Sequence, residues 1–181
     1  TVDGRKYEIS EEFIMAKLEK FEIAPFGPFR FIGKTVYAAP GSGKIFGGLW
    51  ENSKELFDAL DGLAAYATEE TDDAAYMNWN TEDNLLGYTV GRFMRTDTPV
   101  PEGMDFFDIP KQFMAKSLVS GEFDDMIRKA PQLTEEAIKG QQEYEIAWSE
   151  RFMQAEVYPK ENIPNSGVHS VLAYYIPCKK G

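Results

Sequence analysis

Short apolar runs separated by turn-forming residues dominate the hydrophobic pattern of this chain, and they predict β-strands. The chain is expected to be extended from Phe21 onward, because the prolines and glycine of residues 25–28 break any helix there. Further strands are predicted over 74–80, 85–95, 106–122 (interrupted by Pro110), 151–158 and 168–177.

Two stretches have the spacing of apolar residues that is typical of amphipathic helices. The first is 47–63, where Gly62 supplies a stop signal. The second is 123–148, which Pro131 is expected to break or kink, with Thr134 restarting it as a cap. Each helix therefore follows an extended segment and precedes two further strands.

The chain repeats itself at a spacing of 82 residues, which pairs 30–38 with 112–120 (Phe31 with Phe113), Tyr76 with Tyr158, and 87–94 with 169–176. The predicted elements also follow the same order in both parts. We therefore predict an α+β fold, a duplicated β-α-β-β unit with pseudo-twofold symmetry. Its antiparallel sheet would carry the helices on one side and leave a groove between the halves.

The repeat also sets the expected domain bounds. The predicted domain spans 21–180, with halves at about 21–98 and 104–180. The polar residues 1–20 lie outside the repeat and form either a short helix capped by Ser10 or a linker from a missing upstream domain.

The net charge of −11 changes which partners are expected. A surface this acidic repels phosphate backbones and favours cations, so this chain is not expected to contact nucleic acid directly. No apolar run approaches the roughly 20 residues of a membrane span, and no leader-like segment is present, so a cytoplasmic protein without a membrane partner is expected. A single histidine, His169, and a single cysteine, Cys178, exclude a disulfide and a histidine-rich or cysteine-based metal cage, and no cofactor is expected.

Aromatic residues make up 14% of the chain, a high share for its size, and core packing explains most of them. Tyrosine and tryptophan combine a flat apolar surface with a polar tip, which suits planar ligands. The aromatic residues on the strand faces expected to border the groove are Tyr76, Trp79, Tyr88, Phe93, Tyr158 and Tyr174.

Glu156 is the candidate acid of this site. It shares a strand face with Gln154 and Tyr158, and its equivalent at the spacing of 82 is Ala74, so it breaks the symmetry of the repeat. A strand glutamate can also simply face solvent. If Glu156 faces the groove, its burial among aromatic rings is costly unless a cation pairs with it.

Five short motifs resemble, in this order, those of gyrase-inhibitor-like (GyrI-like) domains. These are the effector-binding domains of many AraC-type and MerR-type bacterial transcription regulators, and they also occur as free-standing proteins. The motifs are Lys20-Phe-Glu-Ile with Pro28-Phe-Arg-Phe-Ile-Gly33, Gly48-Leu-Trp50, Leu86-Gly-Tyr-Thr-Val90, Val100-Pro-Glu-Gly-Met104 with Ile109-Pro110, and Glu156-Val-Tyr158 with Tyr175-Ile-Pro177.

The resemblance implies a small-molecule (multidrug) binding domain that stacks lipophilic, often cationic, aromatic compounds on rings around a glutamate. The family's glutamate corresponds to Glu156 and its neighbouring tyrosine to Tyr158, while Trp50 corresponds to the tryptophan of the first helix, where a packing role is also open. The sequence contains no helix-turn-helix, so any DNA-binding domain would lie outside this chain.

Two other functions stay open. Some free-standing relatives are similar to hydrolases that open strained cyclopropane-containing toxins; in that case Glu156 would act as general acid or base, with Tyr158 or Tyr88 beside it. The inhibitor name of the family also suggests a protein-binding module. We expect a binding domain rather than an enzyme.

Overall fold

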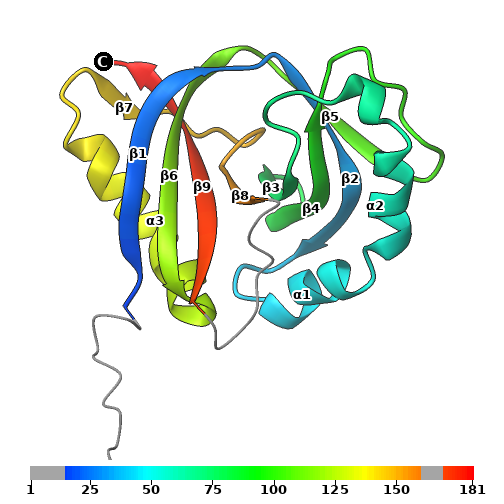
Figure 1. Ribbon diagram of the computed structural model, residues 1–181, viewed down its shortest axis with the longest axis horizontal. Helices are drawn as coiled ribbons and strands as arrows, with labels where there is room; N and C mark the ends of the chain where they lie inside the picture. Colours follow the sequence, from blue (N-terminus) through cyan, green and yellow to red (C-terminus); the bar gives the residue numbers. More distant parts are fainter. Residues whose placement is uncertain (1–14, 160–168) are drawn as a thin grey trace, which may run out of the picture.

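The computed structural model describes residues 15–159 and 169–181, and its strands form one open antiparallel sheet (Figure 1). The order along the sheet is β1-β6-β9-β8-β3-β4-β2-β5, with β7 paired to β9 outside this path. The strands are β1 (Lys17–Phe26), β2 (Phe29–Ala38), β3 (Asp73–Asn80), β4 (Leu85–Met94), β5 (Asp105–Ile109), β6 (Gln112–Glu122), β7 (Tyr144–Ile146), β8 (Gln154–Tyr158) and β9 (His169–Lys180). The helices are α1 (Gly43–Glu51), α2 (Lys54–Asp61), the short 3-10 helix η2 (Ala64–Tyr66) and α3 (Phe123–Lys139).

The strand order confirms the predicted duplication. One half contains β2, α1, α2, β3 and β4, and the other contains β6, α3, β8 and β9. The two halves meet where β3 pairs with β8, and the order outward from this seam is the same on both sides. The strand that precedes each half is exchanged, because β1 pairs with β6 and β5 pairs with β2. The halves therefore depend on each other for a complete sheet.

The spacing of 82 is wrong for two of the three segments that suggested it. Phe31 and Tyr76 belong to the core cluster on one face of the sheet, whereas Tyr158 belongs to the cluster on the other face and Phe113 packs against that same cluster. A twofold axis normal to the antiparallel pair β3 and β8 exchanges residues that point to the same face of the sheet, such as Ala75 and Glu156. The residue numbers of such a pair differ by an odd number, whereas the predicted spacing of 82 is even. Ala74 therefore faces away from Glu156 and is not its equivalent.

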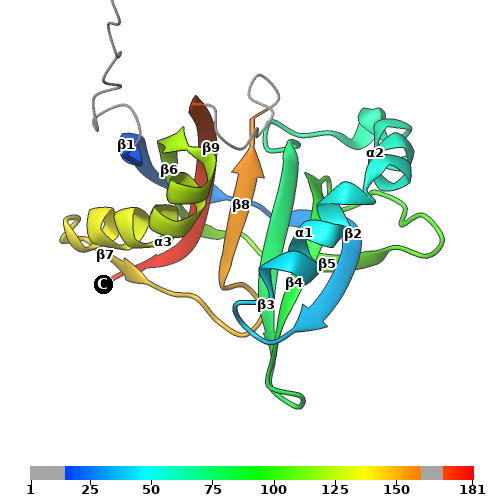
Figure 2. The same cartoon turned by 90° about the horizontal axis from the view of Figure 1, so that it is seen from below.

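The helices of the described residues lie on one face of the sheet, which we call the helix face. Figure 2 shows α3 on one side, α1 and α2 on the other, and the seam strands β8 and β3 running between them. A cluster around Met126 and Leu172 packs beneath α3, and a second around Leu56 and Val90 packs beneath α1 and α2; Trp50 contacts both. A third cluster, rich in phenylalanine, fills the opposite face.

The two predicted helices differ in extent from those observed. The helix expected over 47–63 begins at Gly43 and is split at Asn52 and Ser53, whose backbone amide groups cap α1. The second helix ends at Lys139 rather than at 148, because residues 144–146 pair with β9.

Pro131 does not break the second helix. It lies inside α3, which continues without interruption from Phe123 to Lys139. The buried residues of α3 on both sides of the proline, Met126, Ala130, Thr134 and Ile138, share one face of the helix. At the other end of the chain, β1 already begins at Lys17, inside the expected extension 1–20; residues 1–14, with Ser10, lie outside the described residues.

Two glycines allow β2 and β4 to approach closely. Gly33 and Gly91 are directly opposite each other, and a Cβ atom on Gly91 would lie 1.9 Å from the backbone oxygen of Ile32. Backbone atoms cannot move aside as a flexible side chain can. We expect Gly91→Ala to lower the free energy of unfolding by about 2 kcal/mol or more, measured by urea denaturation.

Gly48→Ala in α1 is the matched control, since a Cβ atom there meets no atom within 4 Å. Alanine is the better helix former, so this variant should be neutral or more stable by up to about 1 kcal/mol. Equal stability of the Gly91→Ala variant and the parent would refute the close approach of β2 and β4.

Candidate functional site

Glu156 lies at the centre of the sheet and points to the helix face. It is opposite Ala75 of β3 on one side and opposite Tyr174 of β9 on the other. Both neighbours belong to the clusters beneath the helices, which fixes the direction of the Glu156 side chain. The residue is partly exposed.

Two tyrosines hold one carboxylate oxygen of Glu156. The hydroxyl of Tyr88 donates a hydrogen bond of 3.1 Å to Oε2, and the hydroxyl of Tyr158 donates one of 3.2 Å to the same atom. The indole N–H of Trp50 donates in turn to the Tyr88 hydroxyl at 2.9 Å. Among the described residues, Oε1 accepts no hydrogen bond and no lysine or arginine forms an ion pair with Glu156.

Aromatic rings surround this hydrogen-bonded group. Phe46 stacks on Tyr88 with ring centroids 4.7 Å apart, and Trp50 meets Tyr158 edge-on at 5.0 Å. Phe46 and Trp50 lie one helical turn apart on α1, so both point to the same side. Both remain partly exposed, whereas Tyr88 and Tyr158 are buried.

Burial controls the protonation of the group. Desolvation raises the pKa of Glu156, and the hydrogen bonds from Tyr88 and Tyr158 oppose this rise only in part. The pKa values of Tyr88 and Tyr158 are also raised far above the ordinary value. The larger cause is burial, and the second is the nearby charge of Glu156. The tyrosines therefore stay protonated hydrogen-bond donors at every physiological pH.

The structure brings five of the eight candidate residues together. Glu156, Tyr158, Tyr88 and Trp50 form one connected group, and Tyr174 is next to it on β9, where burial and the Glu156 charge raise its pKa well above the ordinary value.

The other three candidates lie elsewhere. Tyr76 and Phe93 are buried in the cluster on the opposite face, where Tyr76 contacts Phe31, Phe107 and Phe152. Trp79 is at the end of β3, beside Trp148. Phe46, which the sequence analysis did not consider, belongs to the site; its signal was the four-residue spacing from Trp50.

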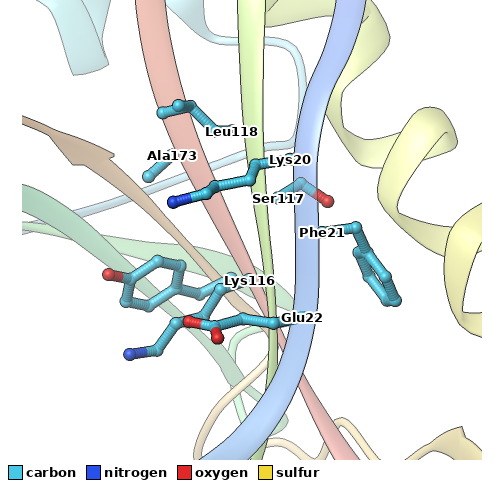
Figure 3. A pocket seen from close by; sticks show the side chains of 8 residues that line it. Lys20, Phe21, Glu22, Lys116, Ser117, Leu118 and Ala173 are labelled. Carbon is cyan, nitrogen blue, oxygen red and sulfur yellow. The ribbon is translucent and has the colours of Figure 1, made fainter.

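A pocket of about 230 Å³ lies along β1, β6 and β9, on the face of the sheet opposite the helices. Figure 3 shows Lys20, Glu22 and Lys116 on one side of these strands and Phe21 and Ser117 on the other. The charge of Lys116 is already paired, because it forms an ion pair with Glu70, whose second oxygen accepts a 2.8 Å hydrogen bond from Tyr175. The charge of Lys116 is therefore not available to a ligand in this pocket.

Within residues 15–159 and 169–181, no three histidine, cysteine or acidic side chains are placed to share a metal ion. No helix in this part of the chain is long and apolar enough to cross a membrane.

Solved structures identify the fold. A structure titled SAV2435 bound to tetraphenylphosphonium is 9% identical, with a TM-score of 0.63 over 88% of this chain and 94% of that chain. A putative transcription regulation protein of Staphylococcus aureus is 10% identical, with a TM-score of 0.64 over 88% and 98%. In a cryo-EM structure of an EcmrR–DNA complex, the matching protein is 16% identical, with a TM-score of 0.60 over 94% of this chain and 60% of that chain.

The chain has the GyrI-like fold. The fold expected from the five motifs is thus confirmed. Sequence identities this low support a shared fold only. No protein-family model and no curated protein sequence matches the chain.

The raised pKa of Glu156 predicts how pH affects the stability of this domain. The folded state binds the proton of Glu156 more tightly than the unfolded state, so the charged carboxylate opposes folding in full above its folded pKa. This cost decreases as pH falls below that value and is absent below the pKa of the unfolded chain. We expect Glu156→Gln to raise the melting temperature at pH 8, with a smaller difference at pH 5.

Glu82→Gln is the control, because Glu82 is exposed in the turn between β3 and β4 and the substitution removes the same charge. Thermal unfolding followed by circular dichroism at both pH values provides the measurement. A Glu156→Gln variant that is less stable than the parent at pH 8 would contradict the desolvation of this carboxylate.

Proposed function

We propose that this domain binds a lipophilic organic cation over Glu156, as a small-molecule effector-binding domain. The observation that carries the proposal is the environment of the Glu156 carboxylate. One of its oxygens accepts hydrogen bonds from two tyrosines, and the other has no partner among the described residues. Desolvation also raises the pKa of this carboxylate. A cation placed at Oε1 would relieve the cost of this burial.

The rings around Glu156 define the kind of cation. Phe46 and Trp50 are partly exposed and stand beside the buried tyrosines, so a ligand over Glu156 would meet aromatic faces and edges rather than polar side chains. Each cation–π contact contributes on the order of 0.5–2 kcal/mol. A flat or aromatic cation gains from the rings and the carboxylate together, whereas a small hydrated ion gains from the carboxylate alone.

The overall charge supports the same class of ligand. A net charge of −11 raises the local concentration of cations around the protein and disfavours anionic ligands. One similar structure was determined with tetraphenylphosphonium, a lipophilic aromatic cation, although the low identity limits that comparison to the fold.

The domain's partner is also part of the proposal. The chain matches 60% of the protein in the EcmrR–DNA complex, and its acidic surface does not suit DNA. We infer that, if this domain regulates transcription, a separate DNA-binding domain makes the DNA contact and this domain supplies the response to the ligand.

Hydrolysis is the second candidate, favoured by one observation. A desolvated glutamate of raised pKa beside two tyrosine hydroxyls has the composition of a general acid–base site. In such a reaction Glu156 would take a proton from water as the water oxygen bonds to a cyclopropane carbon and the strained C–C bond breaks. The electron pair of that bond would pass to the conjugated oxygen of the substrate, which a tyrosine would orient and which would receive the proton from Glu156. Incubation with a cyclopropane-containing electrophile decides: product beyond one equivalent per protein supports an enzyme, and stoichiometric capture supports binding.

The binding proposal predicts a selective effect of Glu156→Gln. We expect the affinity for tetraphenylphosphonium to fall about five- to thirtyfold, because a desolvated charge contact worth on the order of 1–2 kcal/mol is lost. The affinity for neutral triphenylphosphine oxide, which keeps three of the four phenyl rings, should change less than about twofold. Isothermal titration calorimetry measures both, with Glu82→Gln as the charge-matched control.

The same contact predicts a pH dependence of the parent. Protonation removes the charge of Glu156, so cation binding should weaken as pH falls through the raised pKa, while binding of the neutral compound stays constant. If parent and Glu156→Gln variant bind both compounds equally, Glu156 does not recognise the cation.

A further inference from the structure

Trp79 and Trp148 line a hollow that the Glu156 site does not use. Its volume is about 410 Å³, and Ser149, Glu150 and Met153 complete its lining. The volume falls in the range of small-molecule sites. Trp148 is 54% exposed, which is unusual for so large an apolar side chain and is not explained by packing of the core.

Backbone hydrogen bonds fix the walls of this hollow. The loop between β7 and β8 passes the end of β3 (Figure 2). There the backbone N–H of Trp79 donates to the backbone oxygen of Glu150 at 2.8 Å, and the backbone N–H of Met153 donates to the backbone oxygen of Met77 at 3.0 Å. Within the loop, the Ser149 N–H donates to the Phe152 oxygen at 2.9 Å and the Phe152 N–H donates back at 3.2 Å. The two tryptophans are thus carried by segments that are tied to the sheet.

The lining has the chemistry of a site for an ammonium group without N–H donors. Tryptophan is the side chain that attracts cations most strongly through its ring face. Met153 adds a polarisable sulfur, and the exposed carboxylate of Glu150 forms no ion pair among the described residues. A primary ammonium or a metal ion needs several oxygen acceptors, whereas a quaternary ammonium is satisfied by rings and one nearby negative charge.

We propose that the hollow of Trp79, Trp148, Glu150 and Met153 binds the quaternary ammonium head of a small, free organic cation, as a second site. Along β3, Trp79 is four residues from Ala75, which is opposite Glu156, so the two sites lie on the same face about 13 Å apart. Met77 and Gln154, joined by a 3.3 Å contact between Sδ and Nε2, stand between them. This site therefore does not depend on the function proposed for Glu156.

Choline and its neutral isostere 3,3-dimethyl-1-butanol provide the test. The indole N–H signals of the three tryptophans, assigned through single Trp→Phe variants, are followed by NMR as each compound is added. We expect choline to shift the signals of Trp79 and Trp148 in a saturable way in the millimolar range and to leave Trp50 unchanged, while the neutral compound gives no saturable shift. Trp50 reports on the Glu156 site, so the failure of one proposal is distinguishable from the failure of the other.

Two variants test the residues. Trp148→Ala removes an exposed ring and should weaken choline binding about fivefold or more, the effect of losing one cation–π contact. Glu150→Gln should weaken it as well, and Glu82→Gln, which removes the same charge at another exposed position, should not. Because all three side chains are outside the core, the variants are expected to fold, which circular dichroism checks.

Several results would overturn the proposal. These are the absence of a saturable shift with choline, equal binding of choline and the neutral isostere, unchanged affinity in both Trp148→Ala and Glu150→Gln, or equal weakening by Glu150→Gln and Glu82→Gln. The last result would assign the attraction to overall charge rather than to this hollow.

Discussion

The desolvated carboxylate of Glu156 is the group around which the helix face is organised. An ionised side chain at the centre of a sheet is expensive unless polar groups hold it. Here the cost is offset only in part, by two tyrosine hydroxyls on the same oxygen, and the pKa remains raised. The position of Trp50 follows from the same need, since its indole N–H occupies the lone pair of Tyr88 and directs the tyrosine hydrogen toward Glu156.

The duplicated fold explains why such a group can exist at the seam. The strands β3 and β8 are central, so a side chain there is remote from the edges of the sheet, and each half contributes its own helices to either side. Glu156 belongs to one half, whereas Tyr88 and Trp50 belong to the other. The small residue opposite Glu156 is Ala75, which leaves room for the tyrosines. Symmetry thus supplies the position, and a single acid on one side of the seam makes one site rather than two.

The order of the elements and part of the Glu156 site could be predicted from the sequence. The remaining site residues depended on the register in which neighbouring strands pair. Alternation along a single strand placed Glu156 and Tyr158 on the same face correctly, and the element order gave the duplicated unit. Alternation does not say which face of one strand matches which face of the next, and so Tyr76 and Phe93 were grouped with residues that point the other way. The spacing of 82 had the same weakness, because a shift of one residue reverses the direction of every side chain. Pro131 was misjudged for a different reason: a buried apolar stripe held α3 together despite the lost hydrogen bond.

The opposite face shows how this protein treats a carboxylate that has its own cation. Glu70 accepts a hydrogen bond from Tyr175, as Glu156 does from its tyrosines, but it also pairs with Lys116, whose ammonium lies 5.3 Å from the Tyr175 ring centre and 5.4 Å from that of Phe26. Carboxylate, tyrosine hydroxyl and aromatic faces there surround an internal cation. Glu156 has the same three kinds of group around it and, among the described residues, no lysine or arginine. The charge of Glu70 is thus balanced by a lysine of the chain, whereas that of Glu156 has no such partner among the described residues, which is the difference on which the proposed cation binding rests.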